Sequence, residues 1–235
     1  MLAAVNIEIA GESSLIIYFA DQPSAQVSAQ VCSAAALLPS LLGRDLVDLV
    51  PSYASLLVIF DAYATDHLDV RRRILSSLQT LEDVLADSGK LVTLPVFYGA
   101  EAGPDLADLA SRAGMTAAQV IALHSAAEYR VYAIGFAPGF AYLGEVDERI
   151  ATPRLATPRR RVPRGAVAIA DRQTAVYPAV SPGGWNLIGL CPQRLFDPLA
   201  EPSMPVQVGD KVRFEAIDEA TFMALGGELP EQELR

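Results

Sequence analysis

The first 97 residues show two kinds of hydrophobic pattern in regular order. Short alternating segments predict strands over residues 5–9, 14–19, 45–50, 54–60 and 91–97. Longer segments with helical spacing predict helices over 24–38, closed by Pro39, and over 66–86, capped by Asp66 and ended by Gly89. The apolar stripe of the second helix consists of Leu68, Ile74, Leu75, Leu78, Leu81, Val84 and Leu85. This order predicts a two-layer α/β domain over residues 1–90, with the helices on one sheet face.

The rest of the chain has a different pattern. Two short helices are expected over 105–112 and 117–126, with Gly114 and Thr116 between them. Short apolar segments then predict strands over 129–136, 167–170, 176–178, 185–190 and 211–216. Many short strands separated by Gly and Pro indicate a barrel or a sandwich. We therefore expect an α+β protein with a second domain over residues 91–235.

Composition narrows the class of protein. The 235 residues carry a net charge of −10, which argues against a nucleic-acid partner because phosphate binding needs a basic surface. The helix pair at 105–126 imitates a helix-turn-helix, but its second helix has no Arg or Lys. Two cysteines, no basic leader and no apolar run near the roughly 18 residues of a membrane span lead us to expect a soluble, cytoplasmic protein without a membrane partner.

Several common sites are not predicted. With only His67 and His124 in the chain and no cysteine pair at ligand spacing, we expect no metal bound by this chain. A lone His such as His124 is more often a hydrogen-bonded core residue than a catalyst. No phosphate-binding glycine loop is present, so ATP, if it is used, is held in an unfamiliar way or by a partner. No Gly-x-Ser-x-Gly elbow is present either.

A locally basic segment stands out in this acidic chain. Pro-Arg pairs recur every five residues at 153–154, 158–159 and 163–164. If the segment runs extended at about 3.1 Å per residue, successive Arg lie roughly 15 Å apart, too far to share one anion. We therefore expect one arginine of the segment to face a pocket while the others face a partner or solvent. A salt-bridged interface and a plain solvated loop are the alternatives.

Two stretches, 135–142 and 181–185, are dense in Gly, Pro and aromatic residues. They would form either the walls of a pocket or tight barrel corners. The expected pocket residues are Phe136, Pro138, Gly139, Phe140, Tyr142, Tyr177, Gly183, Gly184 and Trp185.

These stretches together resemble the allophanate hydrolase subunit 1 family, which includes component B of prokaryotic 5-oxoprolinase and the Kip-type histidine-kinase inhibitors. The resemblance covers nearly the whole chain, from residues 50–58 and 98–106 through 135–144 and 167–185 to Leu195-Phe196-Asp197. The chain departs from the family pattern at Asp171, Ala175, Leu190 and Cys191. Asp171 and Ala175 stand where the family often has Gly, and Leu190-Cys191 stand where it often has Arg-Thr.

The resemblance implies a cyclophilin-like β-barrel as the second domain. It also implies an ATP-dependent 5-oxoprolinase complex that opens 5-oxoproline to glutamate, formed with a subunit 2 (C) relative and with component A of 5-oxoprolinase. ATP would be held together with these partners. The alternatives are a Kip-type kinase-binding module and the carboxyltransferase component of a biotin-dependent carboxylase. The implied catalytic residues are Glu101, Asp105, His124, Arg154, Arg159, Gln173 and Ser181. Because the family pattern has a Pro-Arg pair at 158–159, the resemblance also implies that Arg159 is the arginine that faces the pocket, with Arg160 and Arg161 facing outward.

Overall fold

The computed structural model describes residues 5–78 and 89–230. The chain divides into two compact units, Met1–Gly89 and Lys90–Arg235. The sequence placed this boundary between residues 90 and 91.

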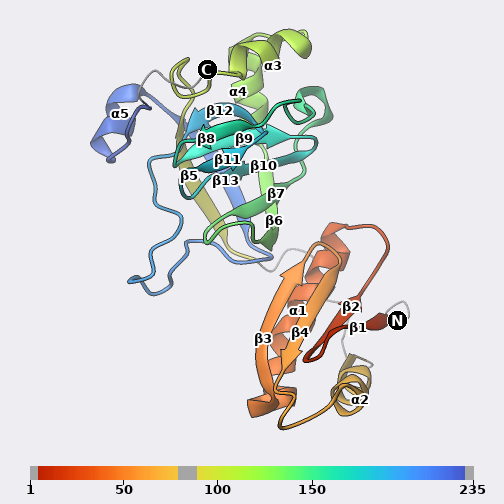
Figure 1. Cartoon of the computed structure of the whole chain (residues 1–235). Helices are drawn as coiled ribbons and strands as arrows, with labels where there is room; N and C mark the ends of the chain where they lie inside the picture. The colour runs from red at the N-terminus through yellow and green to blue at the C-terminus, as the bar shows by residue number, and fades with distance from the viewer. Residues whose placement is uncertain (1–4, 79–88, 231–235) are drawn as a thin grey trace. The chain divides into compact units, whose positions relative to one another are not determined.

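The first unit is a four-stranded antiparallel sheet with helices on one face (Figure 1). The sheet has the order β1-β2-β4-β3. Its strands are β1 (Asn6–Gly11), β2 (Ser14–Tyr18), β3 (Leu46–Ser52) and β4 (Ser55–Phe60). Helices α1 (Ala25–Leu42) and α2 (His67–Leu78) cover the face from which Leu15, Ile17 and Val58 project. This is the expected two-layer arrangement.

Helix α1 corrects two expectations. It continues through Pro39 to Leu42 and ends at Gly43, whose φ is 57°. Proline removes only one hydrogen-bond donor in the last turn, and the longer helix buries both Leu38 and Leu42 in the core. The stretch Ala25–Asp45 is also long and apolar enough, by length and composition alone, to cross a membrane. The expectation that no such run exists is therefore wrong, although this helix packs against the sheet as a core helix does.

Helix α2 begins as expected but uses a different apolar stripe. The Asp66 carboxylate accepts the backbone N–H groups of Leu68 and Asp69, each at 2.9 Å, and so caps the helix. Val70, Ile74 and Leu78, spaced four apart, face the core, whereas Leu68 is 79% exposed and Leu75 is also exposed. The remaining expected stripe residues, Leu81, Val84 and Leu85, lie outside the described residues.

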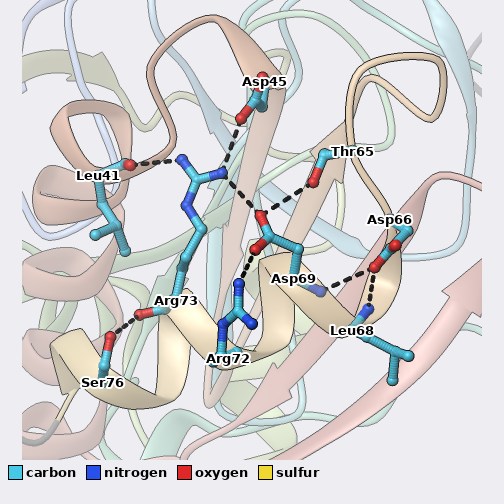
Figure 2. A network of polar contacts seen from close by, with 9 residues as sticks. All are labelled: Leu41, Asp45, Thr65, Asp66, Leu68, Asp69, Arg72, Arg73 and Ser76. Atoms are coloured by element: carbon cyan, nitrogen blue, oxygen red, sulfur yellow. Dashed lines mark hydrogen bonds and ion pairs between the residues drawn. The ribbon is translucent and has the colours of Figure 1, made fainter.

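Arg73 ties α2 to the end of α1 (Figure 2). Its Nη2 donates to the carbonyl of Leu41 at 2.7 Å. Its Nη1 donates to Asp45 at 2.8 Å and to Asp69 at 3.2 Å. One guanidinium therefore satisfies a helix-end carbonyl and two carboxylates on the same side of the sheet.

The second unit is built on a closed barrel of seven strands in the order β10-β7-β6-β13-β5-β12-β9 (Figure 1). All neighbours are antiparallel except the parallel pair β5 and β13. The strands are β5 (Leu91–Phe97), β6 (Glu128–Ile134), β7 (Ala141–Gly144), β9 (Ala166–Ala170), β10 (Gln173–Val176), β12 (Asn186–Leu190) and β13 (Lys211–Ile217). The α+β class is confirmed, and the second unit is a barrel.

Alternate residues of the strands face two separate cores. One buried cluster takes side chains from all seven strands, for example Val96, Val131 and Phe214, so it fills the barrel interior. Helices α3 (Leu106–Arg112) and α4 (Ala117–Ala126) pack against this cluster. The other cluster lies on the outer face and takes Ala168 and Ala170 of β9, the residues next to Val167 and Ile169 of the interior.

The outer cluster is covered by elements that the hydrophobic pattern did not predict. These are the two-stranded sheet of β8 (Arg159–Val162) and β11 (Ser181–Gly183), and the short helix α5 (Glu219–Ala224).

The 3-10 turns of the described residues are η1 (Gly43–Asp45) and η2 (Glu148–Ile150). Strand β7 was not predicted, and the strand expected at 176–178 lies instead at Gln173–Val176. Strands of three or four residues rich in Gly, Pro or Arg carry too little alternation to be recognised.

Candidate functional site

The small sheet β8–β11 places one arginine of the basic segment on the inner side. Ser181 pairs with Val162 and Gly183 pairs with Arg159, so β8 has one extra residue between the two pairs. Such a bulge lets both ends of a short strand face the same side. Val162 is fully buried and Arg159 is half-buried, whereas Arg160 and Arg161 are exposed. The structure therefore places Arg159 inward and its two neighbours outward, whereas the pocket that Arg159 was expected to face stays a prediction.

Arg159 is held by Asp105. Nη2 of Arg159 donates to Oδ1 of Asp105 at 2.6 Å, and the two side chains are only 18% and 12% exposed. Oδ2 of Asp105 accepts the backbone N–H of Leu187 at 2.7 Å. Asp105 thus fixes the guanidinium against strand β12. The Nη1 atom of Arg159 is buried and has no hydrogen-bond partner among the described residues.

Five aromatic side chains lie beside this pair, and we call them the aromatic cluster. They are Phe136, Phe140, Tyr142, Tyr177 and Trp185. The Phe140 ring is central, with its centroid 4.9 to 5.7 Å from those of Tyr142, Phe136, Tyr177 and Trp185. The steep interplanar angles, 65° to 84°, are the edge-to-face geometry that aromatic pairs prefer.

The first part of the basic segment runs along this cluster. The N–H of Leu155 donates to the carbonyl of Gly184 at 2.7 Å, and Nδ2 of Asn186 donates to the carbonyl of Pro153 at 2.9 Å. These bonds hold Arg154 next to Trp185, with the guanidinium carbon 5.7 Å from the ring centroid. This is a cation–π arrangement with an exposed cation.

The Tyr177 hydroxyl is the polar group of the cluster. Burial raises its pKa above the ordinary value of 10.0. The positive charges of Arg154 and Arg159 and a hydrogen bond from the backbone of Trp185 act in the opposite direction. Both arginines are therefore close enough to influence one hydroxyl, which makes this end of the cluster electropositive.

Two backbone features shape the cluster. Phe136 has a φ of 70°, a conformation rare for an aromatic residue, and its side chain is 62% exposed. Gly139, with a φ of 90°, has Phe196 so close that a Cβ would lie 2.8 Å from its side chain. The 135–140 loop therefore presents Phe136 at the rim of the cluster by means of a strained backbone. Pro138 is exposed in the same loop.

His124 lies apart from the cluster, inside the barrel. Its ring stacks on Phe214 at 4.6 Å between centroids and bonds Tyr98 Oη at 2.8 Å and Thr174 Oγ1 at 2.9 Å. Complete burial lowers its pKa to about 3, so the imidazole is neutral. His124 is therefore a hydrogen-bonded core residue, the first of the two roles considered from the sequence, because all three contacts belong to the barrel interior.

The other expected catalytic residues fall in different places. Arg154 lies on the aromatic cluster, and the Arg159–Asp105 pair lies close to Tyr177. Ser181 lies on β11, two residues before Gly183, which approaches Tyr177. Glu101 is exposed in the turn before α3, and Gln173 begins β10, paired with Gly144 and Ala170. Of the expected pocket residues, Gly183 and Gly184 lie against Tyr177 and Leu155, respectively.

Asn186 is a structural residue that the sequence analysis missed. It is fully buried, and its Oδ1 accepts from Arg112 at 3.0 Å. Its Nδ2 donates to Ile169 as well as to Pro153. A single amide therefore joins α3, β9 and the basic segment. The sequence feature that could have identified Asn186 is its position as a polar residue directly before the apolar run Leu187–Leu190.

In residues 5–78 and 89–230, no group of three or more His, Cys, Asp and Glu side chains is arranged to hold a metal ion.

The sequence matches a family model and curated relatives over most of its length. Residues 5–206 match the model of the carboxyltransferase domain, subdomains C and D. The chain is 37% identical to component B of 5-oxoprolinase from Bacillus subtilis, over 95% of this chain and 98% of that protein. It is 39% identical to component B of 5-oxoprolinase from Haemophilus influenzae, over 89% and 97%.

Solved structures share the same fold. TTHA0988 superposes with a TM-score of 0.78 at 36% identity, covering 93% of this chain and 41% of that longer chain. PH0987 of Pyrococcus horikoshii, described as a conserved uncharacterized protein, superposes with a TM-score of 0.56 at 42% identity, over 92% of this chain and all of that one. The Kluyveromyces lactis urea amidolyase has a TM-score of 0.73 but only 16% identity, over 94% of this chain and 15% of that one, so this likeness concerns the fold alone.

Proposed function

The chain belongs to the 5-oxoprolinase component B family of carboxyltransferase-domain proteins, and from this premise we propose that it is one subunit of an enzyme complex that opens 5-oxoproline to glutamate. The observation that carries the proposal is the 37% identity to component B of Bacillus subtilis 5-oxoprolinase over 98% of that protein. The proposed complex works in the cytoplasm and contains a subunit 2 (C) relative and component A of 5-oxoprolinase.

The chemistry explains why ATP would be consumed. The five-membered lactam of 5-oxoproline is a stable amide. Transfer of the γ-phosphate to its carbonyl oxygen makes the ring carbon a better electrophile, and water then attacks that carbon. The ring C–N bond breaks, so one 5-oxoproline, one ATP and two waters give glutamate, ADP and phosphate. Positioned donors stabilise the charge that develops on oxygen.

The aromatic cluster with Arg154, Arg159 and Asp105 is the proposed contribution of this chain. It offers apolar rings for the flat lactam and guanidinium groups for its anionic part. Two arginines opposed by one aspartate leave a single excess positive charge, too little for a triphosphate. We therefore assign the phosphates of ATP to partner subunits, and we expect the isolated chain to be inactive.

A second candidate is a module that binds a helix of a histidine kinase. The observation that favours it is the Phe136 ring, which a backbone with a φ of 70° holds 62% exposed at the rim of the cluster. The resemblance to urea amidolyase supports no carboxylase activity, because at 16% identity it concerns the fold alone.

The test is reconstitution. The chain is copurified with the products of its neighbouring genes, and 5-oxoproline-dependent release of ADP and glutamate is measured for the complex and for each component. We expect turnover only in the complex. Turnover by the single chain would contradict the assignment of ATP to the partners, and a complex that ignores 5-oxoproline would contradict the proposed function.

A further inference from the structure

Two buried polar atoms at the small sheet have no partner in the part of the chain that the structure describes. They are Nη1 of Arg159 and Oγ of Ser181. Buried donors and acceptors in proteins are nearly always satisfied, because leaving one unpaired loses its interaction with water without replacement. Two such atoms on paired strands therefore lack a polar partner that water or a ligand would supply.

The register brings these two residues to one side of the sheet. Arg159 pairs with Gly183, and Ser181 stands two residues before Gly183 on the same strand. Ser181 pairs with Val162, which points into the outer core, so its side chain faces inward like that of Arg159. Diagonal neighbours of this kind lie about 7–8 Å apart at the backbone, within reach of a long arginine side chain.

The chemistry of the two atoms selects an anion with at least two acceptor oxygens. A guanidinium N–H only donates, and a hydroxyl can donate to the same group. Asp105 already engages the other side of the guanidinium, so one N–H edge of Arg159 remains for a ligand. Arg154 adds the second positive charge beside Trp185. A monoanionic carboxylate, which accepts hydrogen bonds at both oxygens, matches this arrangement in charge and in hydrogen-bonding capacity.

We propose that Arg159 and Ser181 together bind the carboxylate of the substrate, with its ring lying against the aromatic cluster. The identity of the ligand as 5-oxoproline rests on the proposed function, whereas the carboxylate chemistry rests on the two unpaired atoms. Both atoms are buried, so the carboxylate reaches them by displacing an ordered water or a covering side chain.

The experiment measures binding directly, by calorimetric titration of the full-length chain, alone and within its complex, with 5-oxoproline. The matched probe is 2-pyrrolidinone, which has the same lactam ring but no carboxylate. Wild-type protein should bind 5-oxoproline at least tenfold more tightly than 2-pyrrolidinone. Arg159→Ala should lower the affinity for 5-oxoproline about tenfold or more. It should leave the affinity for 2-pyrrolidinone unchanged. Arg160→Ala, the same charge change on the exposed neighbour, should alter neither.

Ser181→Ala separates ligand binding from folding. Its hydroxyl makes no hydrogen bond within the described chain, so this variant should be at least as stable as the wild type. Its affinity for 5-oxoproline should nevertheless fall about fivefold. If the two atoms only hold a structural water, Ser181→Ala will lower the melting temperature and leave the affinity unchanged, which would overturn the proposal.

The remaining outcomes distinguish the two proposals. Arg159-dependent binding of 5-oxoproline without 5-oxoproline-dependent ATP hydrolysis by the complex would sustain the carboxylate site and refute the enzyme assignment. An active complex whose affinity and KM are unaffected by Arg159→Ala and Ser181→Ala would refute the carboxylate site alone. Absence of 5-oxoproline binding to both the chain and the complex would also refute it.

Discussion

The Tyr177 hydroxyl occupies the space beside the backbone of Gly183. A Cβ built on Gly183 would lie 2.4 Å from the Tyr177 oxygen, well inside the contact distance of real atoms. Gly183 is also the residue that pairs with Arg159. The lack of a side chain at 183 therefore lets the tyrosine approach the strand pair that carries the proposed carboxylate site.

Gly183→Ala should displace Tyr177 and disturb this approach. Overpacking of a well-filled region typically lowers the unfolding free energy by about 1–3 kcal/mol, and we expect a loss in that range. The affinity for 5-oxoproline should fall with it. Denaturant unfolding and calorimetric titration test both effects.

Gly184→Ala is the matched control, because its added Cβ would meet its nearest neighbour, the carbonyl oxygen of Leu155, at an ordinary 3.6 Å. We expect little change in stability or binding for this variant. Equal losses at 183 and 184 would show that the close approach of Tyr177 has no special role.

Asp105→Asn should weaken the support of Arg159. The Asp105 carboxylate accepts from both Arg159 and the N–H of Leu187, whereas an amide presents only one acceptor oxygen. Loss of one largely buried, charge-assisted bond should lower the unfolding free energy by about 1.5–3 kcal/mol. Urea unfolding measures this, with Asp108→Asn on the exposed side of α3 as the control. A variant as stable as the wild type would mean that the Arg159–Asp105 pair contributes little.

The inward position of Arg159 was expected from the family resemblance, but its cause was not. The Pro-Arg spacing of five suggested an extended segment in which one arginine faces inward. The observed cause is the bulge between Arg159 and Val162, which depends on pairing with a strand about 20 residues further along the chain. Nothing in the local pattern of residues 159–162 reveals that partner, because both strands are too short for alternation to be visible.

The backbone conformation at Asp171 is a second feature that could not be predicted from the sequence. Asp171 has a φ of 51° and, with Arg172, connects β9 to β10 in a two-residue hairpin. Aspartate tolerates this region better than most residues, so Asp171 can hold the turn at which the resemblance led us to expect Gly. The other departures, Ala175, Leu190 and Cys191, are buried.

Arg73→Ala should destabilise the first unit more than Arg72→Ala. The Arg73 side chain is 26% exposed and bonds Leu41, Asp45 and Asp69, whereas Arg72 is 78% exposed and pairs with Asp69 (Figure 2). Removal of Arg73 leaves the Leu41 carbonyl and Asp45 without this donor, and we expect a loss of about 1–2 kcal/mol. Arg72→Ala should be near neutral, as exposed ion pairs usually are. The two variants remove the same charge from adjacent positions, and denaturant unfolding compares their stability. Equal losses of unfolding free energy would refute the role of Arg73 in tying α2 to the end of α1.

His124 should make stability depend on pH in a defined window. Burial lowers its pKa from 6.5 to about 3 in the native protein, so the unfolded chain binds a proton there at a higher pH than the native chain does. As the pH falls from about 6.5 towards 3, the unfolded state is favoured by up to about 1.4 kcal/mol per pH unit, and above this window the contribution is constant. Between pH 7.5 and 5.5, where most carboxylates remain ionised, the wild type should lose about 1.4 kcal/mol of unfolding free energy from this residue.

His124→Gln removes this titration while it keeps a polar side chain beside Tyr98 and Thr174. The variant should be less stable at pH 7.5 but should lose less stability on acidification, so the two curves of unfolding free energy against pH converge. Its fully folded fraction should still turn over 5-oxoproline in the complex, because the ring lies in the barrel interior rather than at the aromatic cluster. Parallel pH curves would contradict the buried neutral state. Complete loss of turnover in a folded His124→Gln complex would instead restore His124 to the catalytic role that the resemblance implied.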